Sequence, residues 1–184
     1  MIVIDQIIPV SLQESIKDAL LVKNFPWYYV NDVTSLSGNQ TRPALSHLIW
    51  DNFQKVSNFD IDFLGHIGAA HAGFPFTGIK RAKTLLQFPL NLNFAGIALD
   101  HLHVDMPTEH LVVLYYVNDS DGDTIICDHY YNGNEEKDLQ AEDFKILAKV
   151  TPKQGRAVIF DGRYYHTAEQ PQNEIRCIIN LNVI

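Results

Sequence analysis

The chain from Lys83 onward is a succession of short runs rich in β-branched and aromatic residues, and this pattern constrains the fold most strongly. The runs recur at near-regular intervals, and each ends at Gly, Pro, Asn or Asp, the residues that favour turns. The predicted strands cover residues 84–92, 97–104, 111–117, 124–127, 144–150, 157–160, 164–167 and 176–184. Such short strands without intervening helices predict an antiparallel sandwich, jelly roll or barrel.

The N-terminal part has a helical pattern instead. Residues 11–14 match a capping box, and apolar residues at helical spacing follow, which predicts a helix over residues 12–23. A second helix is expected over residues 60–72, followed by a loop rich in Gly and Pro. At 184 residues the chain fits one domain, residues 1–184, with a helical part at about 1–79 and a β-barrel core at about 80–184.

Composition and charge limit the classes of binding partner and the cellular compartment that we expect. The net charge of -8 disfavours nucleic acid, because binding to its backbone depends on clustered Lys and Arg, although Lys80, Arg81 and Lys83 form one local basic group. No apolar stretch reaches the roughly 20 residues of a membrane span, and the N-terminus lacks the pattern of a signal peptide. We therefore expect a cytoplasmic protein. The two cysteines, Cys127 and Cys177, lie in apolar runs, which predicts buried free thiols.

The single His-x-Asp triplet, His103-x-Asp105, lies at the end of a predicted strand. Alone it is a weak signal, because a histidine near an apolar run is more often structural than a metal ligand. His166 strengthens it, since this residue lies on a late predicted strand and Arg176 begins the next one. If these antiparallel strands direct both side chains inward, the imidazole and the guanidinium enter one cavity.

These residues have the chemistry of a metal and cosubstrate site. Two histidine nitrogens and one carboxylate oxygen occupy three of six octahedral positions, which suits non-haem Fe(II). A 2-oxo acid can fill two further positions through its carboxylate and keto oxygens, and the last is left for O2. The far carboxylate of 2-oxoglutarate would then need a cation, and Arg176 offers bidentate geometry. The alternative for Arg176 is a structural ion pair with a neighbouring acid such as Glu174.

Taken in order, His103-x-Asp105, His166 and Arg176 resemble the signature of the 2-oxoglutarate/Fe(II)-dependent dioxygenase superfamily. Two further segments resemble its prolyl 4-hydroxylase-like branch. Residues 114–124 are similar to a strand that leads through a Gly-containing turn to Thr, and residues 151–160 are similar to the Pro-x-x-Gly-x-x-x-x-Phe segment before the distal histidine.

The resemblance covers about residues 80–184. The short length and the segment Phe25-Pro26-Trp27 also resemble small oxygenases carried by bacteriophages, which would place the protein in the host cytoplasm.

The resemblance implies a mainly β fold with N-terminal helices, a double-stranded β-helix of the jelly-roll or cupin-like barrel type. It implies that His103, Asp105 and His166 hold Fe(II) and that Arg176 binds the distal carboxylate of the cosubstrate 2-oxoglutarate, assisted by Thr124. The second substrate is O2, and ascorbate is a supporting reductant. Because halogenating members typically replace the carboxylate ligand with a small residue, Asp105 favours hydroxylation.

The sequence also departs from the family pattern. Arg176 stands where prolyl hydroxylases carry Lys, so a prolyl substrate is not implied. Phe94 stands at the distance of the cosubstrate-binding Tyr of the branch, and Ile178 stands where other branches carry Ser after Arg.

The resulting expectation is oxidation of a C–H bond in a small molecule or peptide, with release of succinate and CO2. Two alternatives remain from other functional classes. One is a cupin-like metalloenzyme that does not use 2-oxoglutarate, and the other is a non-catalytic jelly-roll binding module.

Overall fold

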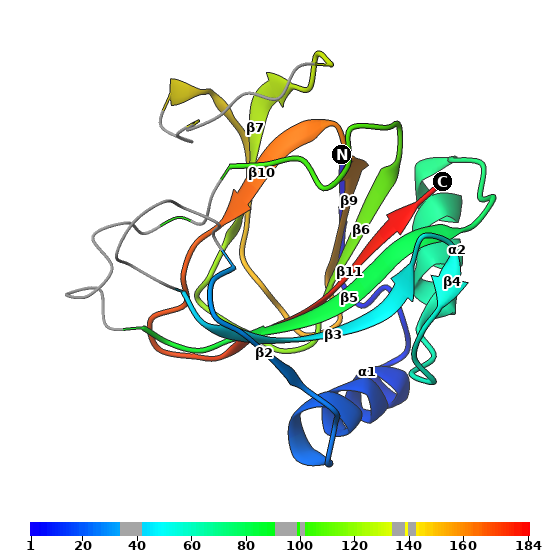
Figure 1. Ribbon diagram of the computed structural model, residues 1–184, viewed down its shortest axis with the longest axis vertical. Helices are drawn as coiled ribbons and strands as arrows, with labels where there is room; N and C mark the ends of the chain where they lie inside the picture. Colours follow the sequence, from blue (N-terminus) through cyan, green and yellow to red (C-terminus); the bar gives the residue numbers. More distant parts are fainter. Residues whose placement is uncertain (34–41, 91–98, 100–101, 134–138, 140–142) are drawn as a thin grey trace.

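A large and a small antiparallel sheet face each other across the centre of the molecule (Figure 1). The computed structural model describes residues 1–33, 42–90, 99, 102–133, 139 and 143–184. The eight-stranded sheet has the order β1-β9-β6-β11-β5-β3-β2, with β4 paired to β3, and the three-stranded sheet has the order β10-β7-β8. The expectation of a mainly β jelly roll is confirmed.

The strands of the large sheet are β1 (Ile2–Ile4), β2 (Tyr28–Val30), β3 (Ala44–Asp51), β4 (Gln54–Lys55), β5 (Ile79–Gln87), β6 (Leu111–Tyr116), β9 (Ala157–Asp161) and β11 (Arg176–Val183). The strands of the small sheet are β7 (Thr124–Tyr130), β8 (Ile146–Val150) and β10 (Tyr164–Ala168). Every residue of β6 and of β11 is buried, because these neighbouring central strands are covered on both faces. Strands of this kind have continuous apolar sequences, and β6 reads LVVLYY.

Helices cover the outer face of the large sheet (Figure 1). Helix α2 (Asp62–Ala72) packs against β6, β9 and β11. Helix α1 (Val10–Lys17) continues into one π-helical turn, η1 (Asp18–Val22), and both add apolar side chains to the same core. None of the described helices is long and apolar enough to cross a membrane.

The helices predicted over residues 12–23 and 60–72 are confirmed as α1 with η1 and as α2. The predicted capping box at residues 11–14 is wrong, because Pro9 is the N-cap and no side chain caps the helix. Gln13 instead turns inward, where it is buried and its Nε2 donates to Ile8 O at 2.8 Å. That bond ties the first turn of the helix to the segment that precedes it.

The predicted strands of the C-terminal part are largely confirmed, with two corrections. The strand expected at 84–92 is β5, which begins at Ile79. The strand expected at 97–104 is, within the described residues, represented by isolated bridges of Leu99 with Glu169 and of His103 with His166. The free cysteines are buried, as predicted.

The expectation of a helical part at 1–79 was incomplete. Both described helices lie there, but so do β1 to β4, and β3 pairs along its length with β5. Pairing with a distant strand, rather than a local alternation of apolar residues, makes β3 extended. The single-domain organisation over 1–184 stays a prediction.

Candidate metal centre

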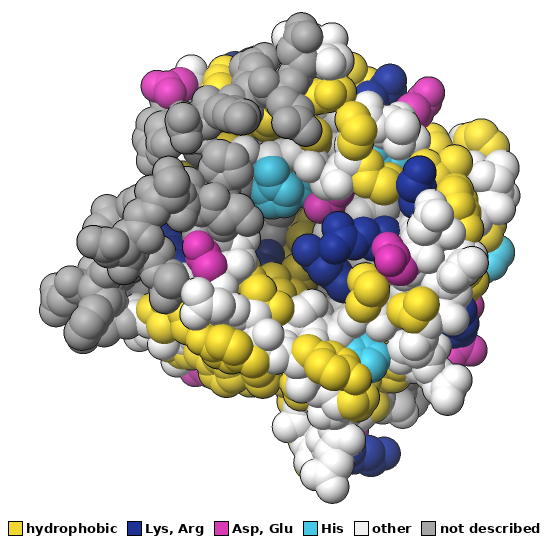
Figure 2. Space-filling view, in the orientation of Figure 1, with side chains coloured by type: hydrophobic (Ala, Val, Ile, Leu, Met, Phe, Trp, Pro, Cys, Tyr) yellow, Lys and Arg dark blue, Asp and Glu magenta, His cyan; other side chains and the backbone are white. Residues whose placement is uncertain are grey.

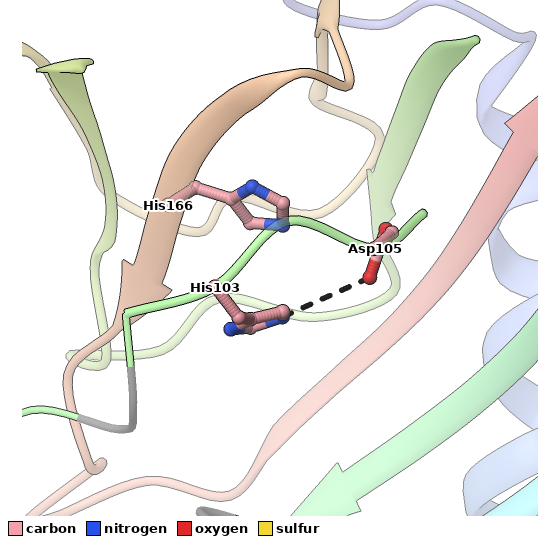
Figure 3. A group of neighbouring side chains, drawn as sticks. All are labelled: His103, Asp105 and His166. Carbon is pink, nitrogen blue, oxygen red and sulfur yellow. Dashed lines mark ion pairs between the residues drawn. The ribbon is translucent and has the colours of Figure 1, made fainter. Parts of the chain in front are cut away.

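His103, Asp105 and His166 meet between the two sheets (Figure 3). Each offers one ligand atom, and these atoms all lie within 4.8 Å of one another. His166 belongs to β10, whereas His103 and Asp105 belong to the segment before β6. A reciprocal backbone pair joins the two segments: His103 N donates to His166 O at 3.0 Å, and His166 N donates to His103 O at 2.9 Å. The backbone therefore sets the separation of the two imidazoles.

The two oxygens of the Asp105 carboxylate have different surroundings. Oδ2 accepts hydrogen bonds from Asn180 Nδ2 at 2.9 Å and from Asn182 Nδ2 at 3.2 Å, both on β11. Oδ1 lies 3.7 Å from His103 Nε2 and faces the histidines (Figure 3). The two amides hold one oxygen in place, and the other faces the space between the histidines where a metal ion could bind.

Burial and hydrogen bonding also prepare His166. Its Nδ1 lies 3.0 Å from Tyr164 O, and because a carbonyl only accepts, Nδ1 carries the proton and Nε2 keeps a lone pair. Burial, followed by the nearby His103, lowers the pKa of His166 to about 4. The imidazole is therefore neutral near pH 7, as a metal ligand must be.

Asp105 is ionised in the same surroundings. Burial would raise the pKa of its carboxyl, but the hydrogen bond of His103, the charge that both histidines acquire in acid and the charge of Lys83 hold that pKa well below its usual range. The centre thus offers two imidazole nitrogens and one carboxylate oxygen, the composition of a facial triad that suits non-haem Fe(II). The donor set fits that metal.

A cavity of about 320 Å³ extends from these residues to Arg176, the predicted anion-binding residue. Arg176 is only 2% exposed. Its Nε donates to Gly122 O, its Nη1 to Gln87 Oε1 and its Nη2 to Thr124 Oγ1, each at 2.8 Å. These three acceptors are uncharged, and the carboxylate of Glu174 is not among them. These contacts orient the guanidinium through neutral acceptors.

Thr124 begins β7 and is buried beside Arg176. Its Oγ1 lies 2.8 Å from Tyr116 Oη as well as from the guanidinium. The middle of the cavity is apolar, with Ile178 among its lining residues. Phe94 lies outside the described residues.

The sequence did not single out the neighbours that hold the centre. Asn180 and Asn182 follow Arg176 on β11 at every second position after Ile178, so all four side chains lie on one face of the strand. Gln87, the acceptor of Arg176, is the residue opposite it on β5. The alternation along β11 was the available signal for both asparagines.

No protein-family model matches the sequence, and no curated protein matches it. The structure, in contrast, resembles solved non-haem oxygenases. The α-ketoglutarate-dependent epimerase SnoN of nogalamycin biosynthesis superposes with a TM-score of 0.70 at 13% identity, covering 100% of this chain and 77% of that one.

Two hydroxylases are similar as well. A Trichoplax adhaerens prolyl hydroxylase in complex with a hypoxia-inducible-factor peptide gives a TM-score of 0.62 at 15% identity, over 100% of this chain and 82% of that one. The viral collagen prolyl hydroxylase of Paramecium bursaria Chlorella virus-1, solved as a 2-oxoglutarate complex, gives a TM-score of 0.54 at 10% identity. The superposition covers 99% of this chain and 94% of that one. The chain therefore shares the jelly-roll fold of the 2-oxoglutarate/Fe(II) oxygenases.

Proposed function

We propose that this chain is an Fe(II)- and 2-oxoglutarate-dependent oxygenase that hydroxylates a C–H bond and releases succinate and CO2. One observation carries the proposal: a single cavity contains a two-histidine, one-carboxylate group and, apart from it, the buried guanidinium of Arg176. These are the two requirements of a 2-oxo acid that chelates a metal at one end and carries a carboxylate at the other. The fold shared with oxygenases of this class supports the same assignment.

Each residue has a defined task in this proposal. His103, Asp105 and His166 would hold Fe(II), which when bound supplies the activation of O2 coupled to decarboxylation of the 2-oxo acid. Arg176 would bind the distal carboxylate of 2-oxoglutarate through its planar fork, and Thr124 would position that fork.

Other residues in and beside the cavity have a supporting task. Asn180 and Asn182 would keep Asp105 in the orientation for one-oxygen ligation. Apolar side chains from β6, β9 and β11 would limit the access of water, and these are Val112, Leu114, Phe160 and Ile178.

Binding and turnover test the proposal. We expect the protein to bind Mn(II), used as a redox-stable substitute for Fe(II), and then 2-oxoglutarate in anaerobic calorimetry. His166→Ala should abolish metal binding. Arg176→Met should weaken 2-oxoglutarate binding at least tenfold and leave metal binding intact, because the guanidinium is remote from the ligands. Lys145→Met, at a side chain that is 78% exposed, is the control for charge removal.

Turnover is measured as succinate formed from 2-oxoglutarate with Fe(II), O2 and ascorbate. Metal binding without 2-oxoglutarate binding would reject the proposal in favour of a cupin-like metalloenzyme. Binding of neither would indicate a non-catalytic jelly-roll module. A circular dichroism spectrum of each variant separates loss of a ligand from loss of the fold.

A further inference from the structure

The cavity contains a second pair of cations, on β5. Arg81, Lys83, Leu85 and Gln87 alternate along this strand, and all four line the cavity. Figure 2 shows Lys and Arg side chains gathered in the central hollow, beside a His and acidic side chains. Lys80 belongs to the opposite face, where its Nζ lies 5.5 Å from the centroid of the Phe53 ring. The basic group Lys80, Arg81 and Lys83 therefore does not form one patch. Arg81 and Lys83 face the cavity, and Lys80 does not.

Neither cavity-facing cation of β5 has a partner in the part of the chain that the structure describes. Lys83 is half-buried and Arg81 is exposed, and no hydrogen bond or ion pair of either occurs among the described residues. Burial lowers the pKa of the Lys83 amino group, and the Asp105 carboxylate partly opposes that shift. A half-buried lysine without an acceptor is costly, so a ligand that supplies one gains affinity there.

The cross-strand neighbours of this pair are uncharged on β11, whereas on β3 the exposed Asp51 lies opposite Arg81. Lys83 pairs with Asn180 and Arg81 pairs with Asn182 in the β5–β11 register. Both asparagines donate to Asp105 Oδ2, and their own Oδ1 atoms are buried without a hydrogen-bond partner among the described residues. On the β11 side the cation pair therefore faces neutral amides, and Lys83, which lies opposite Leu48 on β3, has no charged cross-strand neighbour.

The net charge of the cavity with a metal ion and 2-oxoglutarate bound indicates the charge of a further ligand. The charges of a divalent metal ion and of the dianion 2-oxoglutarate sum to zero. The negative charge of Asp105 and the positive charge of Arg176 also sum to zero. Among the described carboxylates that line the cavity, Asp32 alone then stands against Lys83 and Arg81. Counted over the described lining residues, the cavity keeps a surplus of positive charge, and its unmatched lysine, Lys83, lies next to the candidate metal centre.

We propose that Lys83 and Arg81 bind an oxyanion of the substrate, a carboxylate or a phosphate, and so make this enzyme an oxygenase of small acids. The inference rests on the function proposed above. Arg81 offers a bidentate fork and Lys83 a compact charge, the two modes by which proteins bind carboxylate and phosphate groups. A cavity of about 320 Å³ lies at the small end of ligand sites, which suits a small acid.

The competing role for Lys83 is that of a counter-ion that serves only Asp105. The two roles differ in what the substitution Lys83→Met changes. A counter-ion is needed for metal binding, so its loss would weaken Mn(II) affinity. An anchor for substrate is needed only after the metal and the cosubstrate are bound.

The test uses the protein loaded with Mn(II) and 2-oxoglutarate without O2, so that binding is measured without turnover. The probes are straight-chain carboxylic acids and 2-hydroxy acids, each beside its primary amide, and sugar phosphates beside the free sugars. Binding is followed by calorimetry and by saturation-transfer NMR at millimolar concentrations. We expect acids from one class to bind and their neutral partners to fail.

Lys83→Met should weaken the binding of that acid about 10- to 100-fold, the worth of one charge-assisted hydrogen bond. Arg81→Met should weaken it less, because Arg81 is exposed. Lys80→Met, on the other face of the same strand, should leave it unchanged. Mn(II) and 2-oxoglutarate affinities of Lys83→Met should match those of the wild type.

Three results would overturn the inference: neutral partners that bind as well as the acids, no binding of any acid, or reduced Mn(II) affinity in Lys83→Met. Failure of the proposed function is separate, because it appears as absent 2-oxoglutarate binding before any probe is added. The phosphate and carboxylate series decide between the two sources of the oxyanion.

Discussion

At the scale of single residues, the Asp105 carboxylate depends on two amides of β11. Asn180 and Asn182 both donate to Oδ2, and this leaves Oδ1 toward the histidines. Residues that orient metal ligands typically change metal affinity 10- to 100-fold when they are removed. We therefore interpret the asparagines as positioning residues, which would act on a bound metal ion only through Asp105.

The double variant Asn180→Ala/Asn182→Ala should bind Mn(II) about 10- to 100-fold more weakly than the wild type while remaining folded. The reason is that Asp105 loses the contacts that fix its rotamer. Competition with a chromogenic chelator measures the affinity, and Asn58→Ala, at an exposed position, is the control. Unchanged affinity in a folded double variant would remove the asparagines from the centre.

Cys177 provides a prediction about pH. Burial raises the pKa of its thiol to about 12, although Thr84 and Arg176 oppose the shift. The folded state then holds the proton more tightly than the unfolded state, whose thiol titrates near pH ~8.5. The contribution to stability is complete below that pH and declines as the pH rises toward 12.

Urea unfolding at increasing alkaline pH measures this effect. The free energy of unfolding should fall more steeply with pH in the wild type than in Cys177→Ala, by up to about 1.4 kcal/mol per pH unit. Equal slopes in the two proteins would show that the thiol does not contribute.

At the scale of elements, helix α2 approaches β6 closely through a glycine. A Cβ added at Gly68 would lie 2.5 Å from Val113 Cγ2, whereas one added at Gly65 would meet Ile79 Cδ1 at an ordinary 3.4 Å. The same helix thus contains one glycine required by packing and one that is not.

Gly68→Ala should therefore destabilise the fold by about 1–3 kcal/mol through overpacking. Gly65→Ala should be neutral or stabilising by up to about 1 kcal/mol, since Ala favours the helix. The midpoints of urea unfolding of the two variants, compared with that of the wild type, measure these changes. A Gly68→Ala variant as stable as Gly65→Ala would contradict the close contact.

The elements also show what sequence alone can predict. β6 carries a continuous apolar run and β11 a mainly apolar one, so the positions of both strands followed from the sequence. β3 was missed because its extended form depends on pairing with β5. Its His47 has no local signature of burial, yet its ring lies 2.8 Å from Pro26 O and 2.6 Å from Ser57 Oγ. Those partners are set by tertiary structure.

The sequence also did not predict that Lys80 and Lys83 lie on opposite faces of β5. The sequence showed one basic group, but the predicted strand began at residue 84 instead of Ile79. Only a strand that includes the whole group makes its side chains alternate between the two faces. A boundary error of a few residues therefore hid the cation pair of the cavity.

At the scale of the whole molecule, the candidate metal centre joins distant segments. Its ligands come from the segment before β6 and from β10, and Asp105 is also tied to β11. A ligand that binds only the folded chain stabilises it by mass action.

Mn(II) at about one hundred times its dissociation constant should raise the free energy of unfolding by about 2.7 kcal/mol. His103→Ala should lose this gain, because one ligand is removed. Thermal unfolding with Mn(II), with a chelator and with Mg(II), which prefers oxygen ligands, measures the effect. A rise of the same size in His103→Ala would place the metal elsewhere.

The position of β11 in the sequence has a consequence for synthesis of the protein. This strand lies between β6 and β5 in the large sheet, yet it follows every other described strand along the chain. During translation, β5 and β6 emerge long before the strand that will separate them. The nascent chain therefore has two strand edges exposed until residues 176–183 leave the ribosome, and chaperones that shield such edges would act in that interval.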